Sequence, residues 1–277
     1  MSPRTILLIA RKEIRDALRN RWFLLYTVAF GALALAFARL SLSTTAGTAG
    51  FAGFGRTAAS LVNLVLLVVP LMGLSLGATS LAAERERGTM ATLLVQPVTR
   101  GEVLLGKYLG LALALASALA LGFGAAGLVV AARGGAVDAA VYGRLVGFAL
   151  LLALATLSIG MLISAFAGRS GAATGSALVV WLVLVFLGDL GLMGTALTLR
   201  LDVGTLLALV MANPLESFKI AAIGAITGSL DTLGPAGAYA ARTWGDRLVP
   251  LLAAVLAAWI LTPLLLASLV FDRRGVR

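Results

Sequence analysis

Long apolar stretches alternate with short polar segments along this chain. Because a helix needs about 20 apolar residues to cross the hydrocarbon core of a bilayer, the pattern predicts an all-α membrane protein with six transmembrane helices in a single domain, 1–277. The predicted spans are 22–40, 57–83, 108–132, 145–167, 172–197 and 248–271.

The segment 1–21 has a helical period of its own. Its apolar positions fall on one arc (Ile6, Leu7, Ala10, Ile14, Ala17, Leu18) and its basic positions on the opposite one (Arg4, Arg11, Lys12, Arg15, Arg19). Ser2 and Pro3 indicate the N-cap and the first helical position. We expect an amphipathic helix lying flat at the membrane surface; the alternative is a solvated helix ahead of a span. Its charged part is too long for the n-region of a signal peptide, so we expect no cleavage.

The segment 84–107 is the longest charged insert between spans. Glu84, Arg85, Glu86 and Arg87 end the second span, Gly88 and Thr89 break the helix, and a short apolar piece from Met90 includes Leu93 and Leu94. Thr99 followed by Glu102 predicts a capping box at the start of the next helix. The chain therefore leaves the membrane, makes a hairpin and re-enters.

The segment 200–247 holds apolar pieces too short to cross a membrane, separated by Gly and Pro, so we expect short interfacial or re-entrant helices. Within it, 213–219 is typical of a Pro-started helix with Glu216 and Lys219 one turn apart. This pair is either a structural cap or a docking surface. Asp189, inside the fifth span, is either hydrated near the outer surface or lines a path or dimer contact.

Composition supports the membrane assignment and limits the chemistry. Hydrophobic residues make up 60% and charged residues 12% of the 277 residues, against about 45–50% and 25% in soluble domains. With no Cys and no His, the chain has no disulfide, thiol, His base or usual soft-metal ligand. We therefore predict that it is not an enzyme and that it binds no metal and no cofactor itself.

The net charge of +10 indicates orientation and contact with anionic lipid. Six basic residues lie in 1–21, four in 84–107, one at Arg169 and three in the C-terminal tail, together 14 of 22. Six spans place all four segments on one side. The positive-inside rule makes that side cytoplasmic, with both termini and the hairpin.

Two nucleotide motifs are nearly matched. Residues 101–108 resemble a P-loop, but Tyr108 stands where a Ser or Thr must bind magnesium, and no strand precedes it. Gly122, Gly124 and Gly127 fit a dinucleotide fingerprint inside a predicted span, where no strand-to-helix turn can exist. Four Gly-x-x-x-Gly pairs favour close helix packing: 73/77, 106/110, 143/147 and 171/175.

The N-terminal helix, the six spans and the hairpin resemble the type 2 ABC exporter permeases. The matching hairpin positions are Glu84–Thr89, Leu93, Leu94, Pro97, Arg100–Gly101 and Leu105–Lys107. The resemblance implies a homodimer or heterodimer of six-helix subunits, of which we expect the homodimer, and a hairpin that is a coupling helix seated on a separate ATPase subunit, which binds the ATP and Mg. It also implies that ATPase coupling rests on Glu84, Arg85, Glu86, Arg87, Gly88, Thr89, Met90, Leu93 and Leu94.

Within that family, 10–22, 95–101 and 213–219 are similar to the NosY permeases, which serve copper-site maturation of nitrous oxide reductase. That similarity implies a NosF-like cytoplasmic ATPase dimer, a periplasmic NosD-like protein on the outer loops, and the cell inner membrane. The alternatives are a generic exporter permease for lipid, drug or peptide, and a membrane scaffold without transport. No feature indicates a nucleic-acid partner.

Overall fold

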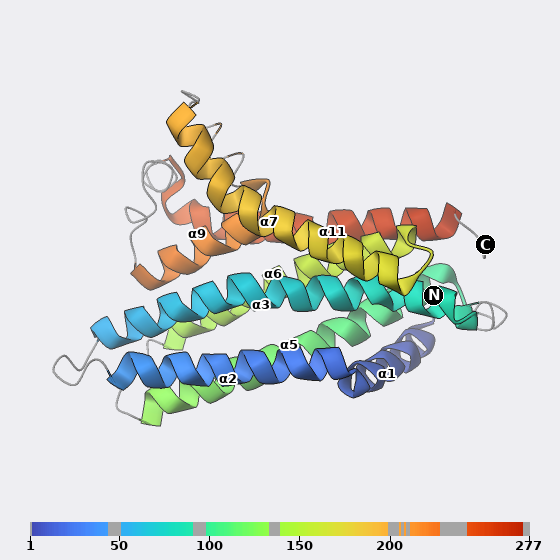
Figure 1. Cartoon of the computed structure of the whole chain (residues 1–277), viewed down its shortest axis with the longest axis horizontal. Helices are drawn as coiled ribbons and strands as arrows, with labels where there is room; N and C mark the ends of the chain where they lie inside the picture. Colours follow the sequence, from blue (N-terminus) through green and yellow to red (C-terminus); the bar gives the residue numbers. More distant parts are fainter. Residues whose placement is uncertain are drawn as a thin grey trace.

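The computed structural model describes residues 2–43, 51–90, 98–132, 139–198, 205, 208, 211–227 and 243–273. Regular structure in these residues is helical throughout (Figure 1). The α-helices are α1 (Pro3–Arg19), α2 (Arg21–Ser43), α3 (Phe51–Glu86), α5 (Arg100–Ala132), α6 (Ala139–Phe166), α7 (Ser170–Thr198), α9 (Pro214–Thr227) and α11 (Leu248–Arg273), and a 3-10 turn, η2 (Gly245–Arg247), precedes the last.

Five of these helices, α2, α3, α5, α6 and α11, are long and apolar enough to cross a membrane. This makes the chain a multi-pass, all-α membrane protein. Helix α7 runs for 29 residues, but its described side chains form only a shorter apolar helix, Ser170–Phe186. The sixth span, and with it the six-span topology, stays a prediction. Asp189 is a residue of α7, but its side chain is outside the described part, so its predicted role stays a prediction.

Helix α1 packs against α5 through small residues. A Cβ on Gly106 would lie 2.7 Å from the Cβ of Ile9, and one on Gly110 would lie 2.5 Å from the carbonyl oxygen of Ala10. Only glycine permits this approach, because real Cβ atoms do not come so close to backbone. The packing role predicted for this glycine pair is confirmed.

Helices α3 and α6 make a second close contact. A Cβ on Gly73 would lie 2.3 Å from Thr156 Oγ1, and one on Gly77 would lie 2.4 Å from the carbonyl oxygen of Leu157. Gly160 faces α3 in return, so this pair is also confirmed. The pairs 143/147 and 171/175 have no atom within 4 Å of an added Cβ. They do not pack against another helix in the described part of the chain.

The Pro-started helix expected at 213–219 is confirmed as α9. Asn213 Oδ1 accepts a hydrogen bond from the Leu215 backbone at 2.9 Å, and its Nδ2 donates to the Leu184 carbonyl at 2.7 Å. Phe218 is fully buried, so α9 packs into the bundle. Lys219 and Glu216 pair at 3.7 Å, and Glu216 is itself buried.

One end of the bundle gathers α1 and several helix termini (Figure 1). The Arg100 guanidinium at the start of α5 donates to the carbonyls of Phe271 and Asp272 at the end of α11, at 2.9 and 2.8 Å. The ends of α3 and α6 and the start of α7 meet there too, as shown below. We call this region the charged end of the bundle.

Candidate functional site

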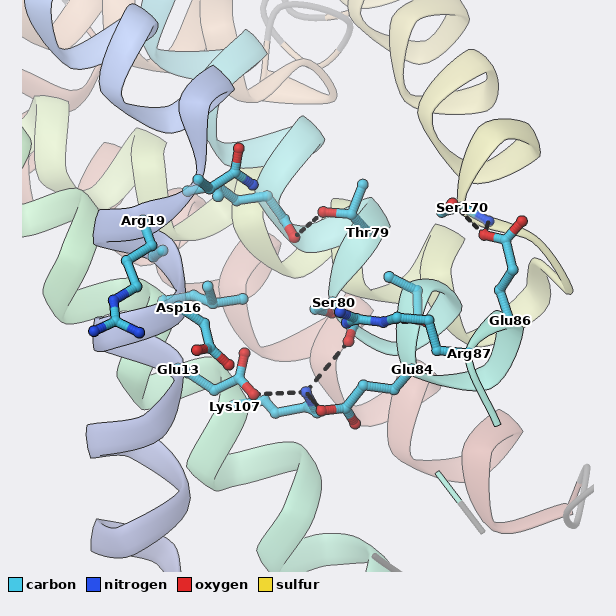
Figure 2. A pocket seen from close by; sticks show the side chains of 15 residues that line it. Glu13, Asp16, Arg19, Thr79, Ser80, Glu84, Glu86, Arg87, Lys107 and Ser170 are labelled. Atoms are coloured by element: carbon cyan, nitrogen blue, oxygen red, sulfur yellow. Dashed lines mark hydrogen bonds and ion pairs between the residues drawn. The ribbon is translucent and has the colours of Figure 1, made fainter. Parts of the chain in front are cut away.

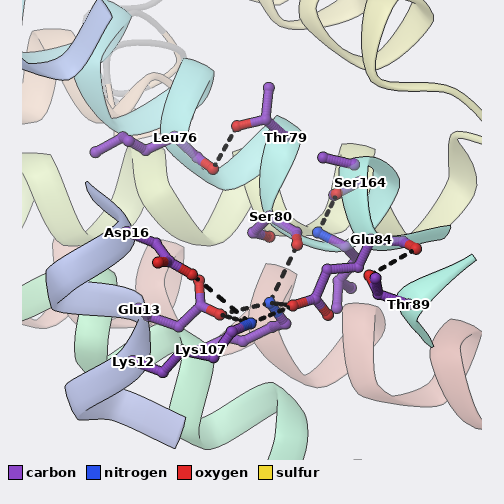
Figure 3. A network of polar contacts seen from close by, with 12 residues as sticks. Lys12, Glu13, Asp16, Leu76, Thr79, Ser80, Glu84, Thr89, Lys107 and Ser164 are labelled. Atoms are coloured by element: carbon purple, nitrogen blue, oxygen red, sulfur yellow. Dashed lines mark hydrogen bonds and ion pairs between the residues drawn. The ribbon is translucent and has the colours of Figure 1, made fainter. Parts of the chain in front are cut away.

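A buried lysine stands at the centre of the charged end. Lys107, on α5, is 1% exposed. Its Nζ lies 2.7 Å from Glu13 Oε1 on α1 and 2.9 Å from Glu84 Oε1 on α3 (Figure 3). It also donates to the Ser80 carbonyl at 3.3 Å. One ammonium group therefore joins three helices.

Lys12 completes this group, which we call the Lys107 cluster (Lys12, Glu13, Glu84, Lys107). Its Nζ lies 2.7 Å from Glu84 Oε1, so the two lysines balance the two buried carboxylates, and Lys12 also contacts the exposed Asp16 at 3.8 Å. Burial acts to lower the pKa of Lys12, but the hydrogen bond to Glu84 and the nearby carboxylates outweigh it, and the pKa is raised. Balance matters because an unpaired buried charge costs several kcal/mol, on the order of 3–5 when one partner is removed.

Glu84 has one oxygen left over. Its Oε2 is buried and has no hydrogen-bond partner among the described residues. A buried acceptor without a partner is costly, whereas Glu84 Oε1 is paired with both Lys12 and Lys107. Within the Lys107 cluster, this is the one buried side-chain oxygen without a hydrogen-bond partner among the described residues.

The residues after Glu84 contact other helices. The Arg85 guanidinium donates to the carbonyl of Ala167, just after α6. Glu86 Oε2 accepts hydrogen bonds from the backbone nitrogen, at 3.0 Å, and the hydroxyl of Ser170, at the start of α7 (Figure 2). A carboxylate at a helix N-terminus is favourable because the first backbone N–H groups are otherwise unpaired.

The last turn of α3 is therefore tied to most of the bundle. Through Glu84, Arg85 and Glu86 it reaches α1, α5, the end of α6 and the start of α7. Ser164 on α6 adds to this, because its Oγ accepts from the backbone nitrogens of Leu81 and Ala82 at 2.9 Å. A displacement of this turn must move or break several contacts at once.

Helix α3 ends where the sequence predicted. Gly88 has φ of 72°, a left-handed conformation that glycine adopts without steric cost. Its nitrogen donates to the Arg85 carbonyl at 3.1 Å. Glu86, Arg87, Gly88 and Thr89 are exposed, whereas Met90 is buried. The predicted coupling residues Leu93 and Leu94 lie outside the described residues.

The predicted capping box is confirmed at the start of α5. The Thr99 backbone nitrogen donates to Glu102 Oε2 at 2.9 Å, and the Glu102 nitrogen donates to Thr99 Oγ1 at 3.3 Å. Glu102 Oε1 also accepts from the Ser2 backbone nitrogen. Ser2 is the N-cap of α1 as predicted, but its side chain makes no capping hydrogen bond.

The near-match to a P-loop is an ordinary helix. Residues 101–108 lie inside α5, Lys107 points into the ion-pair cluster, and the Tyr108 hydroxyl donates to the Leu154 carbonyl at 3.2 Å. A phosphate-binding loop needs free backbone N–H groups and an available lysine. Neither exists here.

Sequence reasoning missed Glu13. It lies on the same arc of α1 as Ala10 and Ala17, and these three are the buried residues of that helix. The sequence did contain a signal: Glu13 is a single carboxylate on the arc of α1 that carries Ala10 and Ala17, which indicates a buried ion pair. Leu7 and Leu18, expected on the apolar arc, are exposed instead, which suits a helix with one face toward lipid.

Comparison with known proteins gives a family match and two relatives. The profile described as "ABC-2 family transporter protein" matches residues 7–276. A "Probable ABC transporter permease protein NosY" of Pseudomonas aeruginosa is 36% identical over 146 residues, covering 51% of this chain and 53% of that protein. A protein of the same description from Stutzerimonas stutzeri is 37% identical over 123 residues, 44% of each. The alignments thus span about half the length of these curated relatives.

Proposed function

The chain belongs to the ABC-2 family of transporter proteins and is a permease subunit of an ABC transporter. We propose that it converts ATP hydrolysis by a separate ATPase subunit into movement of its membrane helices. The exposed turn after α3, Glu86 to Thr89, together with the hairpin that follows, receives the ATPase. The ATP and Mg belong to that subunit.

The observation that supports this proposal is the tie between the last turn of α3 and the other helices. Glu84 is buried, so its role lies inside the protein, where it holds α3 to α1 and α5. Arg87 and Thr89 are exposed and face the ATPase. Force applied to the turn reaches α1, α5 and α7 through charged contacts.

The similarity to NosY proteins supports a narrower assignment. The permease would form a homodimer in the cell inner membrane, with both termini cytoplasmic. It would serve copper-site maturation of nitrous oxide reductase, together with a NosF-like ATPase and a periplasmic NosD-like protein. With no Cys or His, and with no group of three or more acidic residues suited to a metal in the described part, its contribution would be motion rather than copper binding. Lys219, partly exposed beside Glu216, is the docking candidate of that pair.

Co-purification with a co-expressed ATPase tests the proposal. Arg87→Glu reverses an exposed charge on the turn, and we expect it to lower the amount of ATPase retained and the ATPase rate of the complex. Arg144→Glu is the matched control, because Arg144 is an exposed arginine at the start of α6, away from the turn. Equal retention of ATPase by both variants and the wild type would contradict the proposal.

A further inference from the structure

Arg100 lies on the second leg of the hairpin, where the chain returns into the bundle as α5. Its Nη1 donates hydrogen bonds to the carbonyls of both Phe271 and Asp272, at 2.9 and 2.8 Å. The guanidinium carbon also lies 5.9 Å from the centre of the Phe271 ring, within the range of about 6 Å for a cation–π contact. We call these three contacts the Arg100 clamp.

The clamp uses acceptors that α11 cannot satisfy by itself. The last four carbonyls of a helix have no partner within the helix, and they carry the negative end of its dipole. Phe271 and Asp272 lie in the last turn of α11, which ends at Arg273. Phe271 is also buried, so its ring packs the guanidinium against the bundle. The clamp therefore joins the start of α5 to the end of α11 by charge and by packing.

Helix α11 has little other contact with α5. It packs mainly against α6 and α9, and only slightly against α5. Lys107, two turns beyond Arg100 on α5, contacts α1 and α3 instead. A movement of the second leg therefore reaches α11 chiefly through Arg100.

Helix α11 connects the charged end to the opposite end of the bundle. It has 26 residues, which gives a length of about 39 Å at 1.5 Å per residue, and it runs along the bundle toward α9 (Figure 1). Helix α9 lies against α11, α6 and α3. Because α3 is itself the first leg of the hairpin, each leg is connected to a helix that reaches α9.

From these contacts we propose that Arg100 is a coupling residue, which transmits displacement of the hairpin to α11 and through α11 to the end of the bundle that holds α9. The last turn of α3 serves the first leg, and the Arg100 clamp serves the second. This inference rests on the proposed function, because it needs an ATPase that displaces the hairpin. It adds a second route, with its own residue and its own output helix.

Spin-label distances in the complex with the ATPase test this route. The chain has no cysteine, so an α5–α11 pair of labels can be placed at Leu128→Cys and Val249→Cys, both exposed and far from the charged end. We expect their distance to change by about 2 Å between the ADP state and a trapped ATP state, the size of helix shifts in known switching proteins. An α1–α7 pair at Leu7→Cys and Leu182→Cys, in a separate sample, reports the first route.

Arg100→Gln removes the charge of the clamp. We expect it to reduce the change of the α5–α11 pair to less than half, while the amount of ATPase retained and the change of the α1–α7 pair stay as in the wild type. Arg100→Lys keeps a cation that can donate to both carbonyls, and it should retain most of the change. Arg273→Gln is the matched control, because it removes an exposed arginine from the same end of α11 and is not part of the clamp.

A full change of the α5–α11 pair in Arg100→Gln would overturn the inference. Loss of both changes in that variant would also overturn it, because Arg100 would then act on the whole protein and not on α11. An equal loss in Arg273→Gln would do the same. If the α1–α7 pair moves in the wild type and the α5–α11 pair does not, this inference fails and the proposed function stands. If neither pair moves although the ATPase binds, both fail.

Discussion

Replacing Lys107 with methionine removes the charge at the centre of the Lys107 cluster and keeps most of the side-chain volume. The ammonium lies 2.7 Å from Glu13 and 2.9 Å from Glu84. At an effective dielectric constant of about 20, each attraction is worth about 6 kcal/mol before desolvation. Desolvating an ion costs several kcal/mol and cancels much of this.

The loss in the variant also has an upper limit. A glutamate in water has a pKa of about 4.3, so a stranded carboxylate can take up a proton at pH 7 for about 3.7 kcal/mol. Glu84 keeps Lys12 as a partner, whereas Glu13 keeps only the weaker 3.4 Å contact with Lys12. We therefore expect Lys107→Met to destabilise the permease by about 3–4 kcal/mol, the lower part of the range for breaking a buried ion pair.

Equilibrium unfolding in mixed detergent micelles measures the loss. Arg144→Met, on an exposed residue, serves as control and should stay within about 0.5 kcal/mol of the wild type. Adding Glu13→Gln and Glu84→Gln to Lys107→Met should recover at least half of the loss, because no buried carboxylate is left unpaired. The reasoning is refuted if Lys107→Met costs less than about 1 kcal/mol, or if the triple variant is no more stable than the single one.

Three further predictions concern single positions. Gly110→Ala should destabilise the permease by about 1–3 kcal/mol in the same unfolding assay, because the new Cβ would lie 2.5 Å from the Ala10 carbonyl oxygen. Gly124→Ala, where a Cβ meets open space, should not destabilise it. Gly88→Ala should lower the free energy of unfolding by about 1–2 kcal/mol, because residue 88 has a left-handed φ of 72°. Gly88→Asn should lower it less, and equal stability of the wild type and both variants would contradict this. The pKa of Lys12 is raised above the ordinary 10.5, so its stabilisation is fully present below pH 10.5 and lost as pH rises through the folded-state pKa. The stability gap between wild type and Lys12→Gln should be flat from neutral pH to 10.5 and shrink above it.

Much of the fold could be predicted because apolar length and helix-end chemistry are local. Thr99 with Glu102, Gly88 and Asn213 with Pro214 each mark a helix end in the structure as in the sequence. These signals need only neighbours a few residues apart. Helix bounds without a capping signal were harder to predict, since α6 starts at Ala139, six residues before the predicted span 145–167.

The site could be predicted only in part, because its contacts join residues far apart in sequence. The charged segment Glu84 to Arg87 is conspicuous, but nothing local shows that Glu84 turns inward while Arg87 stays exposed. In the sequence, Lys107 stands out only as part of the near-match to a P-loop. Its partners in the structure are Glu13, 94 residues away, and Glu84 on α3. Small residues at 106 and 110 indicated close packing, but not that α1 was the neighbour.

The most direct test of the central claim follows movement rather than stability. The chain has no cysteine, so spin labels can be placed at Leu7→Cys on α1 and Leu182→Cys on α7, both exposed positions. In the complex with its ATPase, the distance between the labels should differ between the ADP state and a trapped ATP state. The variant with Lys107→Met, Glu13→Gln and Glu84→Gln should bind the ATPase but lose that difference. A distance change equal to that of the wild type in this variant would contradict transmission through the Lys107 cluster.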